Sequence, residues 1–460
     1  MVLAAVLFLA CSGDDGPGAH ESPDSAPHVA DDTGTPVSTP QGIVLKHTPR
    51  NLLVISLDTA RRDRLSFFDD RDLTPNLAAI FSGGVVLEDH RTCSNWTGPS
   101  IYCAQTGNFE LDYDVWPTAL NWTDGDPLVT WPPAKNETLA TLLGGAGFDT
   151  TLVTSNAIFS LDLEGGAYGF DREIRWIWAA APDVVDMAID NAKDLGKDGK
   201  RWYYHVHFID PHEQYHPPQS FWPDPDMACP WDMTSTDVCK QLSGGALWQG
   251  LDDDEKDLAR ACLFNVYEGE LRYWDSELAR FWSYFDKAGL LDDTLVVFWT
   301  DHGQAFAEHD EKFNHGVTLY DPETRATAAF WARDIEPGRW PGPTIHQDLA
   351  PTILRALDVP LGKHTGMVLG EAPDDRMLVG FDYFVGHSIP LISVVQSDLK
   401  LMYAWDGTIH LYDLAVDPDE LVDQYDPKDP DVQRLWNVLE PRIERIDKVW
   451  PGLKRVPPTP

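Results

Sequence analysis

The sequence predicts an α/β fold: a mostly parallel sheet sandwiched by helices, followed by a small antiparallel sheet at the C-terminal end. From residue 51 onward, short unbroken apolar runs alternate with longer helical patterns, as in parallel sheets buried on both faces. After about residue 370, short strand patterns follow one another directly. Three of the apolar runs end in Asp or His. Ligands of such sheets gather outside the carboxyl ends of the strands, so we expect a site there.

Each element follows from the local residue pattern. Buried parallel strands are predicted at residues 51–57, 148–153, 203–209 and 295–300. Helices are predicted between them, including 137–146 and 258–287. The C-terminal sheet is predicted from strands at 392–395, 399–403 and 408–412, with a closing helix at about 431–449. We therefore expect a main domain over 49–372 and a C-terminal α+β subdomain over 373–460.

The N-terminal segment has the features of an export signal. Residues 2–10 are uninterrupted apolar, which is too short to span a bilayer but suits the core of a secretory signal. Phe8-Leu9-Ala10-Cys11 resembles the cleavage box of bacterial lipoproteins, whose cysteine becomes lipidated. We expect 1–11 to be a lipoprotein-type signal and 12–48, rich in small and polar residues, to be a disordered tether. The protein would be exported to the bacterial envelope (periplasm or cell surface) and would touch the membrane only through its N-terminal lipid anchor.

The remaining cysteines are compatible with an oxidising compartment. Cys229 and Cys239 flank a short polar loop and could close it, and Cys93 and Cys103 bracket the segment around Thr97. Their pairing stays open, since connectivity does not follow from sequence alone.

Charge narrows the range of partners. The chain has 35 Lys and Arg against 74 Asp and Glu, a formal net charge of −39, and the tether region holds only six of these acids. Such acidity argues against a nucleic-acid partner, because a polyanion needs cationic side chains to bind it. A small anionic ester remains compatible if a bound cation reverses the field locally.

The strand ends carry the residue types of a cation site. Asp58, Asp301 and His302 each follow a predicted strand and supply oxygen and nitrogen ligands. Asp58 could instead cap a helix. Thr97 precedes Gly98-Pro99, a typical start of a helix, where it could act as a nucleophile or only as an N-cap.

Several segments resemble, in the same order, the motifs of the sulfatase family within the alkaline phosphatase superfamily. They are the strand ending at Asp58, Thr97-Gly98-Pro99-Ser100 leading to Thr106-Gly107, 207–218, Asp301-His302-Gly303, His315 with Arg325, 346–354, 399–403 and 411–418. The resemblance implies an alkaline-phosphatase-like fold for the main domain. It also implies one divalent metal ion (Ca, Mg, Mn or Zn), since Gln214 stands where a second-metal histidine would follow Asp210.

The resemblance also implies roles for single residues. The expected metal ligands are Asp58, Thr97, Asp301 and His302, and the expected catalytic residues are Thr97, His212 and His315. His207 and Arg61 are expected to bind substrate. His205 shares a strand face with His207 and is expected to be a satisfied core or surface histidine without a role in the site. Loops 110–135 and 213–250 are expected to line the substrate pocket.

Three positions depart from the family pattern. Type I sulfatases oxidise a cysteine or serine to formylglycine at the position of Thr97, so no formylglycine is expected here. Ile101 replaces the arginine of the nucleophile motif, and Thr154-Ser155-Asn156 replaces a Lys-Trp-His element. We therefore expect a metal-dependent hydrolase that cleaves sulfate or phosphate esters through a metal-bound threonine. The alternatives are a phosphotransferase or phosphodiesterase acting on a surface glycan or lipid, and a non-catalytic binding protein.

Overall fold

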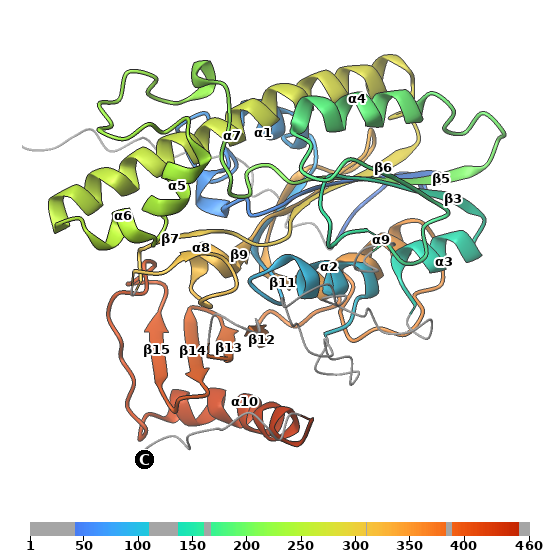
Figure 1. Ribbon diagram of the computed structural model, residues 1–460. Coiled ribbons are helices and arrows are strands. Elements are labelled where there is room, and N and C mark those ends of the chain that lie inside the picture. The colour runs from blue at the N-terminus through green and yellow to red at the C-terminus, as the bar shows by residue number, and fades with distance from the viewer. Residues whose placement is uncertain (1–41, 110–136, 161–166, 310, 383–388, 450–460) are drawn as a thin grey trace, which may run out of the picture. The chain divides into compact units, whose positions relative to one another are not determined.

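Parallel strands form the centre of the main sheet, as predicted (Figure 1). The computed structural model describes residues 42–109, 137–160, 167–309, 311–382 and 389–449. The predicted signal (1–11), the tether as far as residue 41 and the loop 110–135 lie outside the described residues. Among the described residues the main sheet has nine strands, in the order β11-β2-β10-β6-β1-β5-β3-β4 with β9 beside β2.

The neighbours β6-β1-β5-β3-β4 all run parallel. Their bounds are Thr294–Thr300 (β6), Asn51–Leu57 (β1), Arg201–Phe208 (β5), Phe148–Thr154 (β3) and Arg172–Arg175 (β4). The sheet continues through β10 (Ala328–Trp331), which runs antiparallel to β6 and β2, then β2 (Val85–Arg91), β11 (Gly338–Ile345) and β9 (Arg325–Ala326). The predicted apolar runs thus form its buried centre.

Helices cover both faces of this sheet. Side chains of alternating residues on a strand point to opposite faces, so β1 contributes to two cores. Leu53, Ile55 and Leu57 belong to the core beneath α1 (Pro75–Phe81), α4 (Ala181–Ala192) and α7 (Asp253–Lys287). Leu52 and Val54 belong to the core beneath α2 (Thr97–Thr106), α3 (Leu139–Gly145) and α9 (Leu349–Ala356). Figure 1 shows these two helical layers.

The remaining elements of the main domain are short. They are the 3-10 turns η1 (Arg62–Arg64), η3 (Gln219–Phe221) and η4 (His346–Asp348), the helices α5 (Thr236–Leu242), α6 (Ala246–Gln249) and α8 (Asp321–Thr324), and the paired strands β7 (Ala305–Phe306) and β8 (Phe313–Asn314). In the described part of the chain, no helix combines the length and apolar character that a bilayer crossing requires.

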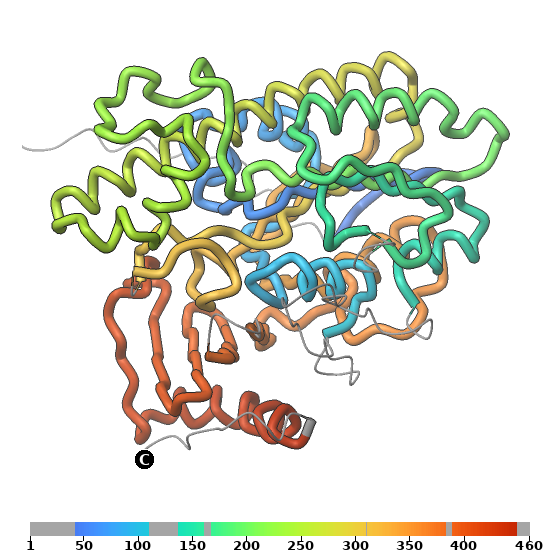
Figure 2. Tube along the Cα trace, in the orientation of Figure 1, coloured from blue at the N-terminus to red at the C-terminus, as the bar shows by residue number. Residues whose placement is uncertain are grey.

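The C-terminal sheet is antiparallel, with the order β12-β13-β14-β15. Its strands cover Leu378–Asp382, Leu391–Gln396, Leu399–Ala404 and Ile409–Asp413, and helix α10 covers Pro430–Val449. Figure 2 shows α10, the red coil at the bottom, crossing the lower ends of these strands. Leu435, Leu439 and Ile443 of the helix share a core with Val394 and Leu401. The prediction of a small antiparallel sheet with a closing helix is confirmed. Strand β12 was not predicted.

Two disulfides tie connecting segments to helices. Cys93 pairs with Cys103 on α2, and Cys229 pairs with Cys262 on α7. Of the pairings that the sequence left open, Cys229 with Cys239 is therefore not the one formed. Cys239 lies on the buried side of α5 as a free thiol within the core, where its sulfur contacts the carbonyl of Met233 at 3.6 Å.

Candidate active site

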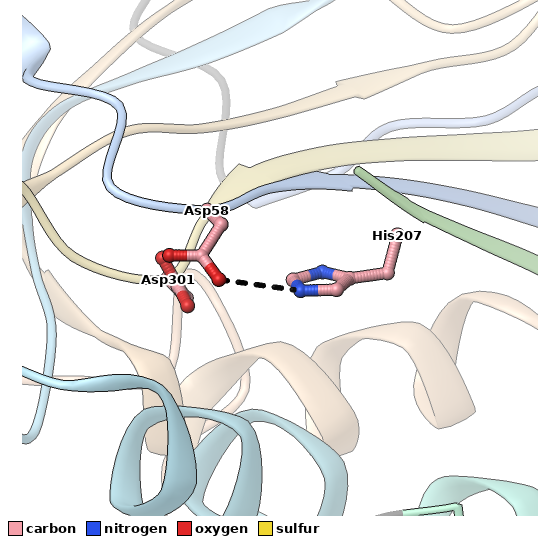
Figure 3. Close-up of side chains that lie close together, drawn as sticks. All are labelled: Asp58, His207 and Asp301. Carbon is pink, nitrogen blue, oxygen red and sulfur yellow. Dashed lines mark ion pairs between the residues drawn. The ribbon is translucent and has the colours of Figure 1, made fainter. Parts of the chain in front are cut away.

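The candidate site lies where four neighbouring strands end. Asp58 follows β1, Asp301 follows β6, Asn156 follows β3, and His207 is the penultimate residue of β5. Because β6, β1, β5 and β3 run parallel and side by side, their carboxyl ends meet at one edge of the sheet. Figure 3 shows Asp58, Asp301 and His207 converging there.

The two aspartates are fully buried and only partly hydrogen bonded. Asp301 Oδ1 accepts from the backbone N–H groups of Thr59 (3.0 Å) and His302 (2.7 Å), and Asp58 Oδ2 accepts from the Asn156 amide. Among the described residues, Asp58 Oδ1 and Asp301 Oδ2 have no hydrogen-bond partner. Burial, together with the charge of Asp301, raises the pKa of Asp58 well above its usual range, and burial raises the pKa of Asp301 to about 8. Unpaired buried carboxylate oxygens are costly, and a bound cation would offset that cost.

His302 presents a lone pair to these carboxylates. Its Nδ1 lies 2.9 Å from the carbonyl of Gly303, which can only accept, so Nδ1 carries the proton and Nε2 does not. Nε2 lies 3.4 Å from Asp301 Oδ2 and 3.7 Å from Asp58 Oδ1. Burial lowers the pKa of His302 to about 3, so the ring is neutral, the form that binds metals.

Thr97 completes the cluster from the first position of α2. Its Oγ1 lies 3.5 Å from Asp58 Oδ2 and 3.3 Å from His302 Nε2, and the residue is buried. Trp96, not Thr97, occupies the N-cap position of α2. The N-cap of η1, the first helical turn after β1, is Arg61, so Asp58 does not cap it. The geometry therefore disfavours the capping alternatives for Thr97 and Asp58.

The donor atoms fit a divalent cation. Ligands bound tetrahedrally at about 2.0–2.2 Å lie about 3.3–3.6 Å from one another. Thr97 Oγ1 and His302 Nε2 lie 3.3 Å apart, and each lies 3.4 to 3.7 Å from a carboxylate oxygen, Thr97 from Asp58 Oδ2 and His302 from Asp301 Oδ2 and Asp58 Oδ1, which is close to that range. Carboxylate, hydroxyl and imidazole donors suit Mg, Mn, Ca or Zn. These four predicted ligands are thus brought together.

Both predicted proton-transfer histidines lie beside the cluster. The ring of His315 is 4.6 Å from that of His302 and 4.8 Å from that of His212, measured between centroids. His212 Nδ1 donates to the carbonyl of Glu213 at 2.6 Å, so Nδ1 carries a proton and Nε2 is the nitrogen that can accept one. Gln304 donates through Nε2 to the Glu213 carboxylate (2.8 Å), so its Oε1 accepts from His315 Nδ1 (3.0 Å). Burial lowers the pKa of His315 well below its usual range, so its Nε2 is also a free acceptor.

The two predicted substrate-binding residues differ in placement. His207 Nε2 lies 3.9 Å from Asp58 Oδ2, within the carboxylate cluster (Figure 3). The Arg61 guanidinium instead pairs with Asp63 at 2.9 Å and with Glu308, and it donates to the carbonyl of Gln304. The guanidinium of Arg61 is therefore paired away from Asp58 and Asp301, and the structure does not place it in the candidate site.

His205 is fully buried and hydrogen bonded at both ring nitrogens, to Ser56 and to Tyr203. It is a satisfied core histidine, as predicted.

Three neighbours of the site carried no assigned role in the sequence. Asn156 donates to Asp58, Gln304 orients His315, and Glu213 holds Gln304. Asn156 and Gln304 each follow a strand end by a few residues, and that position is the signal that could have identified them.

Taken together, a parallel sheet with helices on both faces and a carboxylate, imidazole and hydroxyl cluster at its strand ends defines an alkaline-phosphatase-like α/β protein. The family model described as Sulfatase matches residues 50–359, and the chain belongs to the sulfatase family.

Relatives and solved structures agree with this assignment. A choline-sulfatase of Rhizobium meliloti (strain 1021) is 23% identical over 238 residues, which are 48% of this chain. The aligned segments span 45% and 56% of two curated relatives, so the chain spans about half their length. A protein solved with its substrate D-glucosamine-2-N,6-O-disulfate has a TM-score of 0.67 at 17% identity, covering 88% of this chain and 98% of that one. The phosphonate monoester hydrolase of Agrobacterium radiobacter has a TM-score of 0.63 at 20% identity, covering 87% and 96%. At these identities the two structures show the shared fold.

Proposed function

We propose that the protein is a metal-dependent hydrolase that cleaves sulfate or phosphate esters with Thr97 as its nucleophile. The observation that carries the proposal is the position of Thr97 Oγ1, 3.5 Å from Asp58 and 3.3 Å from His302 in a buried cluster with unpaired carboxylate oxygens. Membership of the sulfatase family and a fold shared with a phosphonate monoester hydrolase support ester hydrolysis.

The metal would be held by Asp58, Thr97, Asp301 and His302. When bound, it would lower the pKa of the coordinated hydroxyl and offset charge that develops on the ester. Thr97 and Gly98 lie in the first turn of α2, where backbone N–H groups lack acceptors within the helix and can donate to an ester oxygen.

The reaction then has two balanced steps. Thr97 Oγ1 bonds to sulfur or phosphorus as the bond to the leaving oxygen breaks. The Thr97 proton passes through Nε2 of His212 or His315 to that leaving oxygen. In the second step water attacks the Thr97 ester and gives its proton to the same histidine, which returns it to Thr97.

The charges around the site favour esters with a single negative charge. Among the described residues, the ion-pair partners of Asp58 and Asp301 are histidines, His207 and His302. Ile101 and Thr154 stand where the family pattern has cationic side chains. Sulfate monoesters, phosphodiesters and phosphonate monoesters carry one charge, whereas a phosphate monoester carries two near neutral pH. We expect the dianion to be the poorest substrate.

Replacement of the nucleophile tests the proposal. Thr97→Ala and Thr97→Ser would be assayed on p-nitrophenyl sulfate, bis(p-nitrophenyl) phosphate and p-nitrophenyl phosphate with Ca, Mg, Mn and Zn. We expect Thr97→Ala to lower kcat by at least about 10³-fold and Thr97→Ser to retain measurable turnover. Equal rates for wild type and Thr97→Ala on every substrate and metal would exclude this mechanism.

The products separate hydrolysis from the alternatives. A phosphotransferase would move the group from Thr97 to an added alcohol or glycan, and mass spectrometry of the products would detect the adduct. A non-catalytic binding protein would bind metal and ester without turnover.

We also propose that the protein is exported and anchored through Cys11. The Cys93–Cys103 and Cys229–Cys262 disulfides support an oxidising compartment. In a bacterial host, the wild type should incorporate radiolabelled palmitate and fractionate with membranes, and Cys11→Ala should do neither. Unchanged labelling of Cys11→Ala would reject the anchor.

A further inference from the structure

A buried chain of hydrogen bonds runs behind the site. Ser56 on β1 lies directly opposite His207 on β5, and Val54 lies opposite His205 in the same register. Ser56 Oγ is 2.7 Å from His207 Nδ1 and 2.8 Å from His205 Nε2, and His205 Nδ1 is 3.0 Å from the Tyr203 hydroxyl. Ser56 and all three β5 side chains are fully buried.

This series of hydrogen bonds ends at His207 Nε2, which lies close to the carboxylates of Asp58 and Asp301. Among the described residues His207 Nε2 has no hydrogen-bond partner. One ligand atom each from Asp58, His207 and Asp301 lie within 4.8 Å of one another (Figure 3). Phe159 packs edge-on against both histidine rings, with centroids 5.0 and 5.4 Å away, on the apolar side of the chain. A buried nitrogen without a partner is costly, and a ligand would remove that cost.

The hydrogen bonds can supply the tautomer that a ligand needs. In the direction that a ligand needs, His207 Nδ1–H donates to Ser56 Oγ, Ser56 O–H donates to His205 Nε2, and His205 Nδ1–H donates to the Tyr203 hydroxyl. The Gln105 amide, 3.3 Å from both His205 Nδ1 and the Tyr203 hydroxyl, then donates to the hydroxyl. In this direction each donor has an acceptor, and His207 Nε2 keeps its lone pair. Metal-binding histidines generally donate their second N–H to an oxygen partner in this way.

We propose that His207 is a further ligand of the divalent metal and that Ser56 and His205 are positioning residues for it. The inference rests on the metal site of the proposed function. With His302 it gives the site two imidazole nitrogens in addition to its oxygens. Imidazole ligands favour borderline ions such as Zn²⁺, whereas Ca²⁺ and Mg²⁺ prefer oxygen alone. The site should therefore select Zn²⁺ over Ca²⁺.

Metal affinity tests this directly. Zn²⁺ and Ca²⁺ binding to the metal-free full chain would be measured by calorimetry for wild type, His207→Ala, Ser56→Ala and the control His410→Ala, whose ring is on β15 and pairs with Asp423. We expect Ser56→Ala to weaken Zn²⁺ binding about 10- to 100-fold and His207→Ala to weaken it at least as much. Ca²⁺ affinity should change little, and His410→Ala should match wild type.

Cobalt spectroscopy gives a readout independent of turnover. The visible absorption of the Co²⁺-loaded protein should change in His207→Ala, because one nitrogen ligand is lost, and stay constant in His410→Ala. Unchanged Zn²⁺ affinity and cobalt spectrum in folded His207→Ala would overturn the proposal. If His207→Ala does not fold, Ser56→Ala decides: unchanged Zn²⁺ affinity there overturns it.

These results separate the two proposals. If the wild type hydrolyses esters but its metal affinity does not depend on His207, the proposed function stands and His207 is rejected as a fifth ligand. A wild type whose Zn²⁺ binding requires His207 but that cleaves no ester would retain the ligand and reject the hydrolase.

Discussion

Thr59 shows how single residues hold the candidate site in place. It follows Asp58 and adopts a left-handed conformation, with φ of 49°, which is costly for a β-branched residue. Its N–H donates to Asp301 Oδ1 at 3.0 Å, and its carbonyl accepts from the Tyr267 hydroxyl at 2.9 Å. These two bonds hold the chain in a sharp turn between the aspartates. The strained backbone is therefore coupled directly to Asp58 and Asp301, two of the proposed metal ligands.

Removing the Tyr267 hydroxyl should destabilise this turn. The same hydroxyl accepts from the backbone N–H of Arg61 at 2.8 Å, so Tyr267→Phe leaves two buried backbone groups without that partner. We expect the free energy of unfolding to fall by about 1–3 kcal/mol in urea titrations. The control is Tyr284→Phe, a part-exposed tyrosine on the same helix, which should change it by no more than about 0.5 kcal/mol. Equal losses in both variants would contradict the assigned role.

For single residues, the sequence predicted proximity where an ordered motif contains the residue. Asp58, Thr97, Asp301 and His302 lie in such motifs at strand ends, and the structure brings them together; their roles as ligands stay a prediction. Arg61 lies next to such a motif, yet its guanidinium is taken by Asp63 and by Glu308, which is 247 residues away. Pairing of Arg61 with Glu308 depends on the folded chain, which brings these distant residues together. A local sequence pattern cannot show that such a carboxylate will occupy the guanidinium.

At the scale of elements, Gly303 shows why the segment after β6 has its residue types. A glycine directly after a strand end is typical of a tight turn. In the structure a Cβ at Gly303 would lie 1.9 Å from the carbonyl oxygen of Pro322. Glycine is therefore required here because the backbone at Gly303 packs directly against the backbone at Pro322. The backbone N–H of Gly303 donates to the carbonyl of Glu323 at 2.9 Å, and the backbone N–H of Gln304 donates to the carbonyl of Pro322 at 3.0 Å. This contact holds His302 and Gln304 against α8.

Gly303→Ala should therefore disturb both stability and metal binding. The added methyl forces the two backbones apart, and we expect a loss of about 1–3 kcal/mol in the free energy of unfolding together with weaker Zn²⁺ binding. The matched control is Gly144→Ala in α3, where an added Cβ would meet no atom within 4 Å. That change should stabilise the protein by about 0.5–1 kcal/mol, because alanine is the better helix residue. Urea titration and calorimetry would measure both, and a neutral Gly303→Ala would refute the close-approach argument.

Elements were predictable where their signal is local. The strand at 51–57 was predicted at its observed bounds because its apolar run is continuous. Helix α7 begins at Asp253, five residues before its predicted start, because Asp252 and Glu255 form a capping box. Strand β12 was missed because it has only five residues and a central glycine, Gly380. Its place in the sheet comes from pairing with β13, which is a non-local contact.

At the scale of the molecule, buried ion pairs join the C-terminal sheet to the main domain. Lys400 on β14 is 1% exposed at its side chain and lies 2.8 Å from Asp321 on α8 and 2.7 Å from Glu420. Asp321 also pairs with Arg91 at 2.7 Å. The sequence predicted both sheets and the family. It could not predict how they join, because Lys400 and Asp321 are 79 residues apart, and Asp321 and Arg91 are 230 residues apart.

The net charge of −39 has a consequence for the whole molecule. Within the site a bound cation would offset the aspartates, but the surface field would still repel an anionic ester on approach. Salt weakens that repulsion, because the Debye length falls from about 30 Å at 0.01 M to about 8 Å at 0.15 M ionic strength. We therefore expect kcat/KM for bis(p-nitrophenyl) phosphate to rise several-fold over this range, with kcat at saturation nearly constant. Steady-state kinetics at fixed metal concentration would measure both.

A substrate without net charge provides the control for this prediction. p-Nitrophenyl phosphorylcholine has the same leaving group, but its cationic choline balances the phosphodiester charge. Its kcat/KM should change little over the same salt range, because a substrate without net charge is not repelled as a whole by the negative surface of the protein. A parallel rise for both substrates would show that salt acts on the protein or its metal. A salt-independent rate for the anion would show that the surface acids lie too far from its path to matter, and the preference for singly charged esters would then depend on the residues of the site alone.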